Sequence, residues 1–90
     1  MVKGTTSTGF KFSVDPDAIK DMEFIELAAE AEDNGLVLPK MLVKLLGDKQ
    51  KKSLYEHVRN KKGRVMADDI SNEVTEIFDA LKEDKEAKNS

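Results

Sequence analysis

The pattern of apolar and polar positions begins with a short strand. In the segment GFKFSVD, the apolar residues Phe10, Phe12 and Val14 alternate with Lys11 and Ser13. This period of two, with aromatic and β-branched residues, is typical of a β-strand. No second strand is obvious, and a lone strand needs a cover in water. Two readings stay open: the strand pairs with a partner or with another copy, or its side chains pack on the helices of the same chain.

A first helix is predicted between Asp15, a good N-cap, and the Asn34-Gly35 pair, which is a typical helix end. One face is apolar at helical spacing, with Phe24, Leu27, Ala28 and Ala31 on it and Ile25 and Ala29 widening it. The opposite face carries Glu23, Glu26, Glu30 and Asp33. Because these acids recur along the outer face of an amphipathic helix, we interpret them as a solvated surface and not as catalytic or metal-binding carboxylates.

Two further helices are predicted on either side of Gly47. The first lies between Pro39 and Gly47 and is almost wholly apolar, so it should be central to the core. The second begins after Asp48 and ends at Gly63. Its apolar stripe is thin and consists of Leu54, Tyr55 and Val58, which indicates a peripheral position.

The last segment, RVMADDISNEVTEIFDALKED, predicts the fourth helix. Its continuous apolar stripe consists of Ile70, Val74, Ile77, Phe78 and Leu81. The fold class expected is therefore mainly α, a small bundle of about four helices with a short N-terminal β-strand. The expected organisation is a flexible leader at 1–8, a single helical domain at 9–83 and a flexible tail at 84–90.

Charge is distributed in blocks along the chain. The net charge is -3, but residues 15–33 carry eight acids and one lysine, and residues 65–90 carry eight acids and three lysines. Residues 40–64 between them carry nine bases and two acids. Blocks of opposite sign can satisfy one another within one chain or between stacked copies.

Few residues could carry chemistry. There is no cysteine, and the only histidine, His57, lies on a basic segment without a recognisable nucleophile, so we expect neither an enzyme nor a cofactor or metal site. No apolar run approaches the roughly 20 residues that span a membrane. The N-terminal segment also lacks the apolar core of a signal peptide. We therefore expect a cytoplasmic protein without a membrane partner.

The basic segment 40–64 raises nucleic acid as an alternative partner. Lysines and arginines on one surface bind phosphate, and a helix pair across Gly47 could mimic a helix-turn-helix. However, the bases are spread around the third predicted helix, and the flanking acidic segments would repel phosphate. A small nucleic-acid-binding regulator is therefore the less favoured reading.

The order of these segments resembles the small tail assembly chaperones of long, non-contractile-tailed bacteriophages, especially those of Gram-positive hosts. The resemblance covers about residues 9–81 and is carried by DMEFIE, KLLG, GRV and EVTEIF. The matching positions are Asp21, Glu23, Phe24, Leu45, Leu46, Gly47, Gly63, Arg64, Val65, Glu73, Glu76, Ile77 and Phe78.

This resemblance implies a non-enzymatic chaperone in the host cytoplasm. It would bind the long, helical tape measure protein, keep it soluble, help to recruit tail tube subunits, and be absent from the finished virion. Such a role needs apolar surface, which the strand and the thin third helix could leave free. We expect the protein-binding residues to be Phe10, Phe12, Val14, Lys44, Lys51, Lys52, Tyr55, Arg59 and Arg64. Charge blocks would let copies stack as a homo-oligomer. A third alternative is a structural head–tail component that is retained in the virion.

Overall fold

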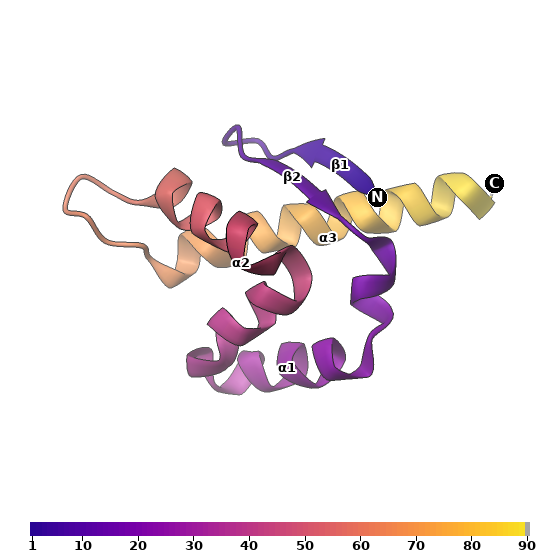
Figure 1. Ribbon diagram of the computed structural model, residues 1–90, viewed down its shortest axis with the longest axis horizontal. Helices are drawn as coiled ribbons and strands as arrows, with labels where there is room; N and C mark the ends of the chain where they lie inside the picture. Colours follow the sequence, from indigo (N-terminus) through magenta and orange to yellow (C-terminus); the bar gives the residue numbers. More distant parts are fainter. Residues whose placement is uncertain (90) are drawn as a thin grey trace.

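The computed structural model describes the backbone of residues 1–89 and the side chains of residues 1–82. Two strands come first, β1 (Val2–Thr5) and β2 (Lys11–Val14), followed by three helices, α1 (Met22–Asp33), α2 (Leu38–Val58) and α3 (Ala67–Asn89). Helix α2 is kinked at Gly47, which divides it into a first arm (residues 38–46) and a second arm (residues 48–58). The hairpin lies across α3 and the second arm, and α1 packs on the first arm at the opposite end of the fold (Figure 1). The segment 84–90, expected to be a flexible tail, falls beyond the described side chains.

The expected bundle of about four helices with one strand is wrong. The structure contains three α-helices and a two-stranded antiparallel sheet within residues 1–89. The two helices expected on either side of Gly47 form one kinked element, α2, because Gly47 has a φ of 81° and a ψ of 164° and redirects the chain without a loop. Such a backbone conformation is essentially restricted to glycine.

The partner of the N-terminal strand lies in the segment expected to be a leader. Residues 2–5 form β1, which pairs antiparallel with β2 so that Val2 faces Val14 and Gly4 faces Phe12. The sequence VKGT gave little indication of a strand, because the segment is short and has a glycine in its interior. The N-terminal strand therefore pairs with a second strand of its own chain.

The outer edge of β2 is closed by a side chain of α2. The Ser13 amide donates to Gln50 Oε1 at 2.8 Å, and Gln50 Nε2 donates to the Ser13 carbonyl at 2.8 Å. Gln50 thereby takes the place of a third strand at this residue. An amide side chain can do this because it holds a donor and an acceptor side by side.

The core joins the hairpin to all three helices. Leu42, Leu54 and Ile77 are completely buried, and Phe12 and Phe24 are nearly so. Helix α1 begins after Asp21, whose side chain accepts from the Glu23 amide, and a 3-10 helix (Pro16–Lys20) separates it from β2. The segment from Asp15 to Asn34, expected to be one helix, is thus divided at Asp21, which caps α1.

Candidate protein-binding groove

Three of the residues expected to bind protein lie in the core. Phe10 and Phe12 are 5% exposed and Val14 is 1% exposed. Their side chains point from the hairpin toward the helices, so they stabilise the fold and offer no free surface. The reading that they pack on the helices of their own chain is therefore confirmed.

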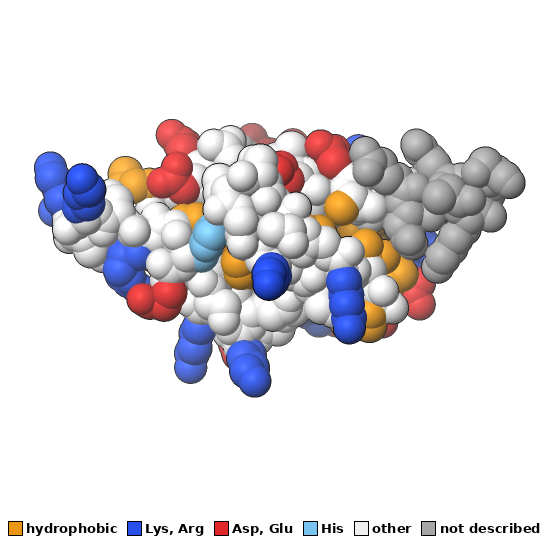
Figure 2. Space-filling view, turned by 90° about the horizontal axis from the view of Figure 1, so that it is seen from above, with side chains coloured by type: hydrophobic (Ala, Val, Ile, Leu, Met, Phe, Trp, Pro, Cys, Tyr) orange, Lys and Arg blue, Asp and Glu red, His pale blue; other side chains and the backbone are white. Residues whose placement is uncertain are grey.

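The basic residues expected at the site do not converge on one surface. Lys44 pairs with Glu23 at 3.2 Å, and Arg59 pairs with Glu56 at 2.7 Å. On the hairpin side, basic side chains project at the tip near the α2–α3 connection and along the lower edge, while most acidic ones gather along the upper edge (Figure 2). Lys52 and Arg64 are exposed. On this side of the molecule, the basic side chains are therefore divided between the tip and one edge.

Lys51 and Tyr55 form a local pair on the second arm of α2. The Lys51 ammonium lies 5.4 Å from the centre of the Tyr55 ring, within the range of a cation–π contact. Tyr55 also lines a hollow of about 190 Å³ together with Leu38, Val65 and Ile70. This hollow shares Leu38 and Ala67 with the apolar groove described next, but Tyr55 itself does not line that groove.

An apolar groove runs between α1 and α3. At one end, a hollow of about 230 Å³ is lined by Ile19, Phe24, Ile25, Ala28, Phe78 and Lys82. The adjoining hollow, of about 350 Å³, shares Ala28 and Phe78 with the first and extends to Glu32 and Ala67. We call these two adjoining hollows the α1–α3 groove.

Small side chains keep the α1–α3 groove open. Ala28 and Ala31 of α1 face Ala67 and Ser71 of α3 across it. The two helices do meet where the rings of Phe24 and Phe78 make an edge-to-face contact, with centroids 5.9 Å apart. Elsewhere alanine and serine are too short to fill the space, so the groove leaves apolar surface in contact with solvent.

One exposed apolar side chain lines the groove, and two others are close to it in sequence. Ile25 is 41% exposed and lines it directly. Met66, at 49%, and Leu36, at 87%, are sequence neighbours of the lining residues Ala67 and Gly35. Apolar surface gathered in one concave strip is typical of protein-binding sites, whereas single exposed apolar residues are ordinary.

The sequence contained a partial signal for this groove. The apolar stripe of α1 is wider than one core-facing row needs, since Ile25 lies beside Phe24, Ala28 and Ala31. The α3 residues Ser71 and Thr75 gave no such signal because they are ordinary polar residues of an exposed helix face. Their place in the groove depends on how α1 and α3 are arranged.

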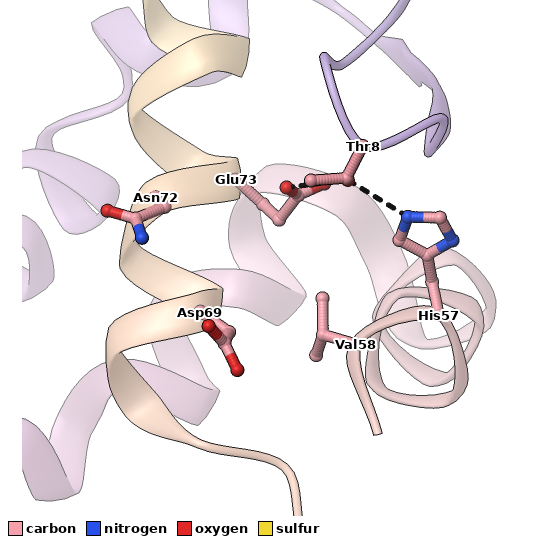
Figure 3. A pocket seen from close by; sticks show the side chains of 6 residues that line it. All are labelled: Thr8, His57, Val58, Asp69, Asn72 and Glu73. Carbon is pink, nitrogen blue, oxygen red and sulfur yellow. Dashed lines mark hydrogen bonds between the residues drawn. The ribbon is translucent and has the colours of Figure 1, made fainter. Parts of the chain in front are cut away.

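Another hollow, of about 270 Å³, is lined mainly by polar residues and lies between the hairpin turn, α2 and α3 (Figure 3). The Thr8 hydroxyl donates to Glu73 Oε2 at 2.9 Å and lies 3.0 Å from His57 Nε2. Since the hydroxyl hydrogen points at Glu73, the threonine oxygen can only accept from His57. These contacts join the hairpin turn to α3 and to α2.

The acidic and histidine side chains and the helices were the remaining candidates for a metal site or a membrane span. Within residues 1–82, no three or more His, Asp or Glu side chains are grouped so that they could hold a metal ion. In the same part of the chain, no helix combines the length and the apolar character needed to cross a bilayer.

Comparison with protein-family models, with curated proteins and with solved structures gave no match to this chain.

Proposed function

We propose that this protein is a non-enzymatic phage tail assembly chaperone. It binds the tape measure protein in the host cytoplasm, keeps this long helical client soluble and aids assembly of the tail tube. Two things support the proposal: the resemblance carried by DMEFIE, KLLG, GRV and EVTEIF, and the α1–α3 groove. The groove is the observation that carries it.

The shape of the groove suits a helical client. A segment of an amphipathic helix can lay its apolar face into a hydrophobic groove while its polar face stays in water. Along α3 the groove reaches from Ala67 to Lys82, and 15 helical steps of about 1.5 Å make it about 22 Å long. That length holds about four turns of a client helix.

Several copies would act along one client, because a tape measure protein is far longer than one groove. Lys51 and Lys52 on α2 would face the acidic outer side of α1 on the next copy. This stacking would form only on the client, where copies are held close together.

Co-expression with the tape measure protein of the same phage tests the proposal. The tagged protein should carry the client from the pellet into the supernatant and retain it in a pull-down. An Ile25→Asp variant should lose the client, because a charge then stands in the apolar groove. Met22→Asp is the matched control: Met22 is 64% exposed, lies on the same helix and is outside the groove lining.

The outcomes separate the candidate functions. Loss of client with Ile25→Asp but not with Met22→Asp supports the chaperone. Failure of the unaltered protein to retain the client, together with salt-sensitive binding to a random DNA duplex, would favour the nucleic-acid-binding regulator. Recovery of the protein in purified, finished tails would favour a structural component. Circular dichroism confirms that both variants are folded.

A further inference from the structure

We propose that the α1–α3 groove selects a client helix with basic residues beside its apolar stripe, and that it holds this helix in one direction, parallel to α3. The inference rests on the proposed function and deepens it by naming the chemistry and polarity of the client segment. Three observations carry it: acids that lie in or beside the groove on both helices, the opposite charges near the two ends, and the length of the groove.

Both helices that form the walls are acidic. Helix α1 contains five acids and no base, and the part of α3 from Ala67 to Lys82 contains five acids and one base. Three of these acids already have partners: Glu23 pairs with Lys44, while Glu73 and Glu76 accept from the hairpin turn. Of the remaining acids of α1, Glu26, Glu30 and Asp33 lie on the face opposite its apolar stripe, and Glu32 lines the groove itself.

The remaining acids on α3 lie beside the groove. Thr75 lines it, and Asp68 and Asp79 are seven residues before and four residues after Thr75 on the same side of the helix. Both aspartates are exposed. A client helix seated between α1 and α3 would therefore place its flanking positions against carboxylates on both sides. Lysine or arginine at those positions would be attracted, and glutamate or aspartate would be repelled.

The two ends of the groove differ in charge. Lys82 lines the end formed by Ile19, Ile25 and Phe78, whereas Glu32 lines the portion that reaches Ala67. A helix carries partial positive charge at its N-terminus and partial negative charge at its C-terminus. The favoured client therefore has its N-terminus near Glu32 and its C-terminus near Lys82. Since α3 runs from Ala67 to Lys82, the client is parallel to α3 and antiparallel to α1.

Designed peptides test the choice of charge. The first probe is a 16-residue amphipathic helix with one leucine stripe and lysines on both flanks, and the second has glutamate at every lysine position. Fluorescence anisotropy with the full-length chain should show the lysine peptide binding about tenfold more tightly at low salt, because several surface ion pairs each contribute a little. The difference should shrink as salt rises. A lysine peptide with its leucines scattered should bind weakly.

A matched pair of variants assigns the effect to the groove. Glu32→Lys should reduce the preference for the lysine peptide, since Glu32 lines the groove. Glu30→Lys makes the same charge change two residues away on α1, outside the groove lining, and should leave the preference nearly unchanged. An equal loss in both variants would mean that overall net charge, and not the groove, attracts the peptide.

A spin label tests the direction. The chain has no cysteine, so Leu36→Cys, at a residue that is 87% exposed, offers a single labelling site beside the Glu32 end. A nitroxide there should broaden the NMR signals at the N-terminal end of the lysine peptide more than those at its C-terminal end. Equal broadening at both ends would overturn the claim of one direction.

The peptide experiments test the charge and direction of the client helix, and the pull-down tests the chaperone function, so the two can fail separately. Equal binding of the lysine and glutamate peptides overturns the charge selection, and binding of neither peptide overturns the groove as a helix site. In both cases the pull-down of the natural client reports on the chaperone independently. Conversely, tight and directional binding of the lysine peptide would support the groove's chemistry even if the natural client were not retained.

Discussion

Thr6 and Glu73 are 67 positions apart in the chain and are joined by a buried hydrogen bond, in which Thr6 Oγ1 donates to Glu73 Oε1 at 2.8 Å. Glu73 is 2% exposed, and its other oxygen accepts from Thr8. One turn further along α3, Glu76 accepts from the amide and the hydroxyl of Ser7, each at 2.8 Å. The hairpin turn is therefore held on α3 by two carboxylates.

Replacing Thr6 by valine should destabilise the protein. Valine keeps the shape but removes the hydroxyl that donates to Glu73 and accepts from the Phe10 amide. Leaving buried polar groups short of a partner costs about 1–3 kcal/mol, so the free energy of unfolding in urea should fall by this amount. Thr75→Val is the matched control at an exposed position of α3, where the free energy of unfolding should change by no more than about 0.5 kcal/mol. Equal stability of the two variants would show that the hydrogen bonds of the Thr6 hydroxyl contribute little to the stability of the fold.

Gly4 should not accept a side chain. A Cβ at this position would lie 2.7 Å from Cζ of Phe12, which packs over Gly4 from the paired strand. Gly4→Ala should therefore lower the free energy of unfolding by about 1–3 kcal/mol, because the buried ring has to move. Shortening the ring with Phe12→Leu in the same chain should recover part of the loss. If the losses in unfolding free energy of the two single variants simply add in the double variant, the close approach to the Phe12 ring is not the reason why Gly4→Ala is destabilising.

Gly47 should also resist substitution, but for a different reason. No atom lies within 4 Å of the position where a Cβ would stand, while its φ is 81°. Gly47→Ala should cost about 1–3 kcal/mol through backbone strain at the kink of α2. Thermal or urea unfolding can measure this against Gly35→Ala, where the space is open and φ is not positive. A loss at Gly35 as large as that at Gly47 would contradict the explanation by strain.

Truncating Leu45 should be costly, whereas truncating Leu36 should not. Leu45 is 4% exposed and Leu36 is 87% exposed, so the same Leu→Ala change removes buried contacts at one position only. We expect a loss of about 2–5 kcal/mol at Leu45, from lost burial and from the cavity left behind. At Leu36 the change in unfolding free energy should be small. Denaturant titration of both variants under the same conditions checks the contrast.

The sequence predicted the helical character of the chain and most of its core. The stripes that contain Phe24, Leu42 and Ile77 are buried as their periodicity indicated, because helical spacing brings apolar side chains to one face. It also marked Gly47 as a break. It did not show that the two arms would remain one kinked helix, since this depends on how each arm packs against α1 and α3.

The pairing partner of the N-terminal strand could not be predicted from local pattern. VKGT has one clear apolar residue and an internal glycine, and it becomes a strand because Gly4 leaves room for the Phe12 ring. The roles of Thr6 and Glu73 were hidden for a similar reason. A glutamate on a helix is usually solvated, and only a partner far away in the sequence makes its burial favourable.

By itself, the sequence determined which faces of the helices are apolar, where the chain breaks, and how charge is divided into acidic and basic blocks, because these depend on residue type and spacing. The tertiary structure alone decided which apolar residues are covered and which remain exposed. It buried Phe10 and Phe12, paired Lys44 and Arg59 with acids, and left Ile25 open in the groove. The physical reason is that exposure depends on contacts between distant segments, which local periodicity does not specify.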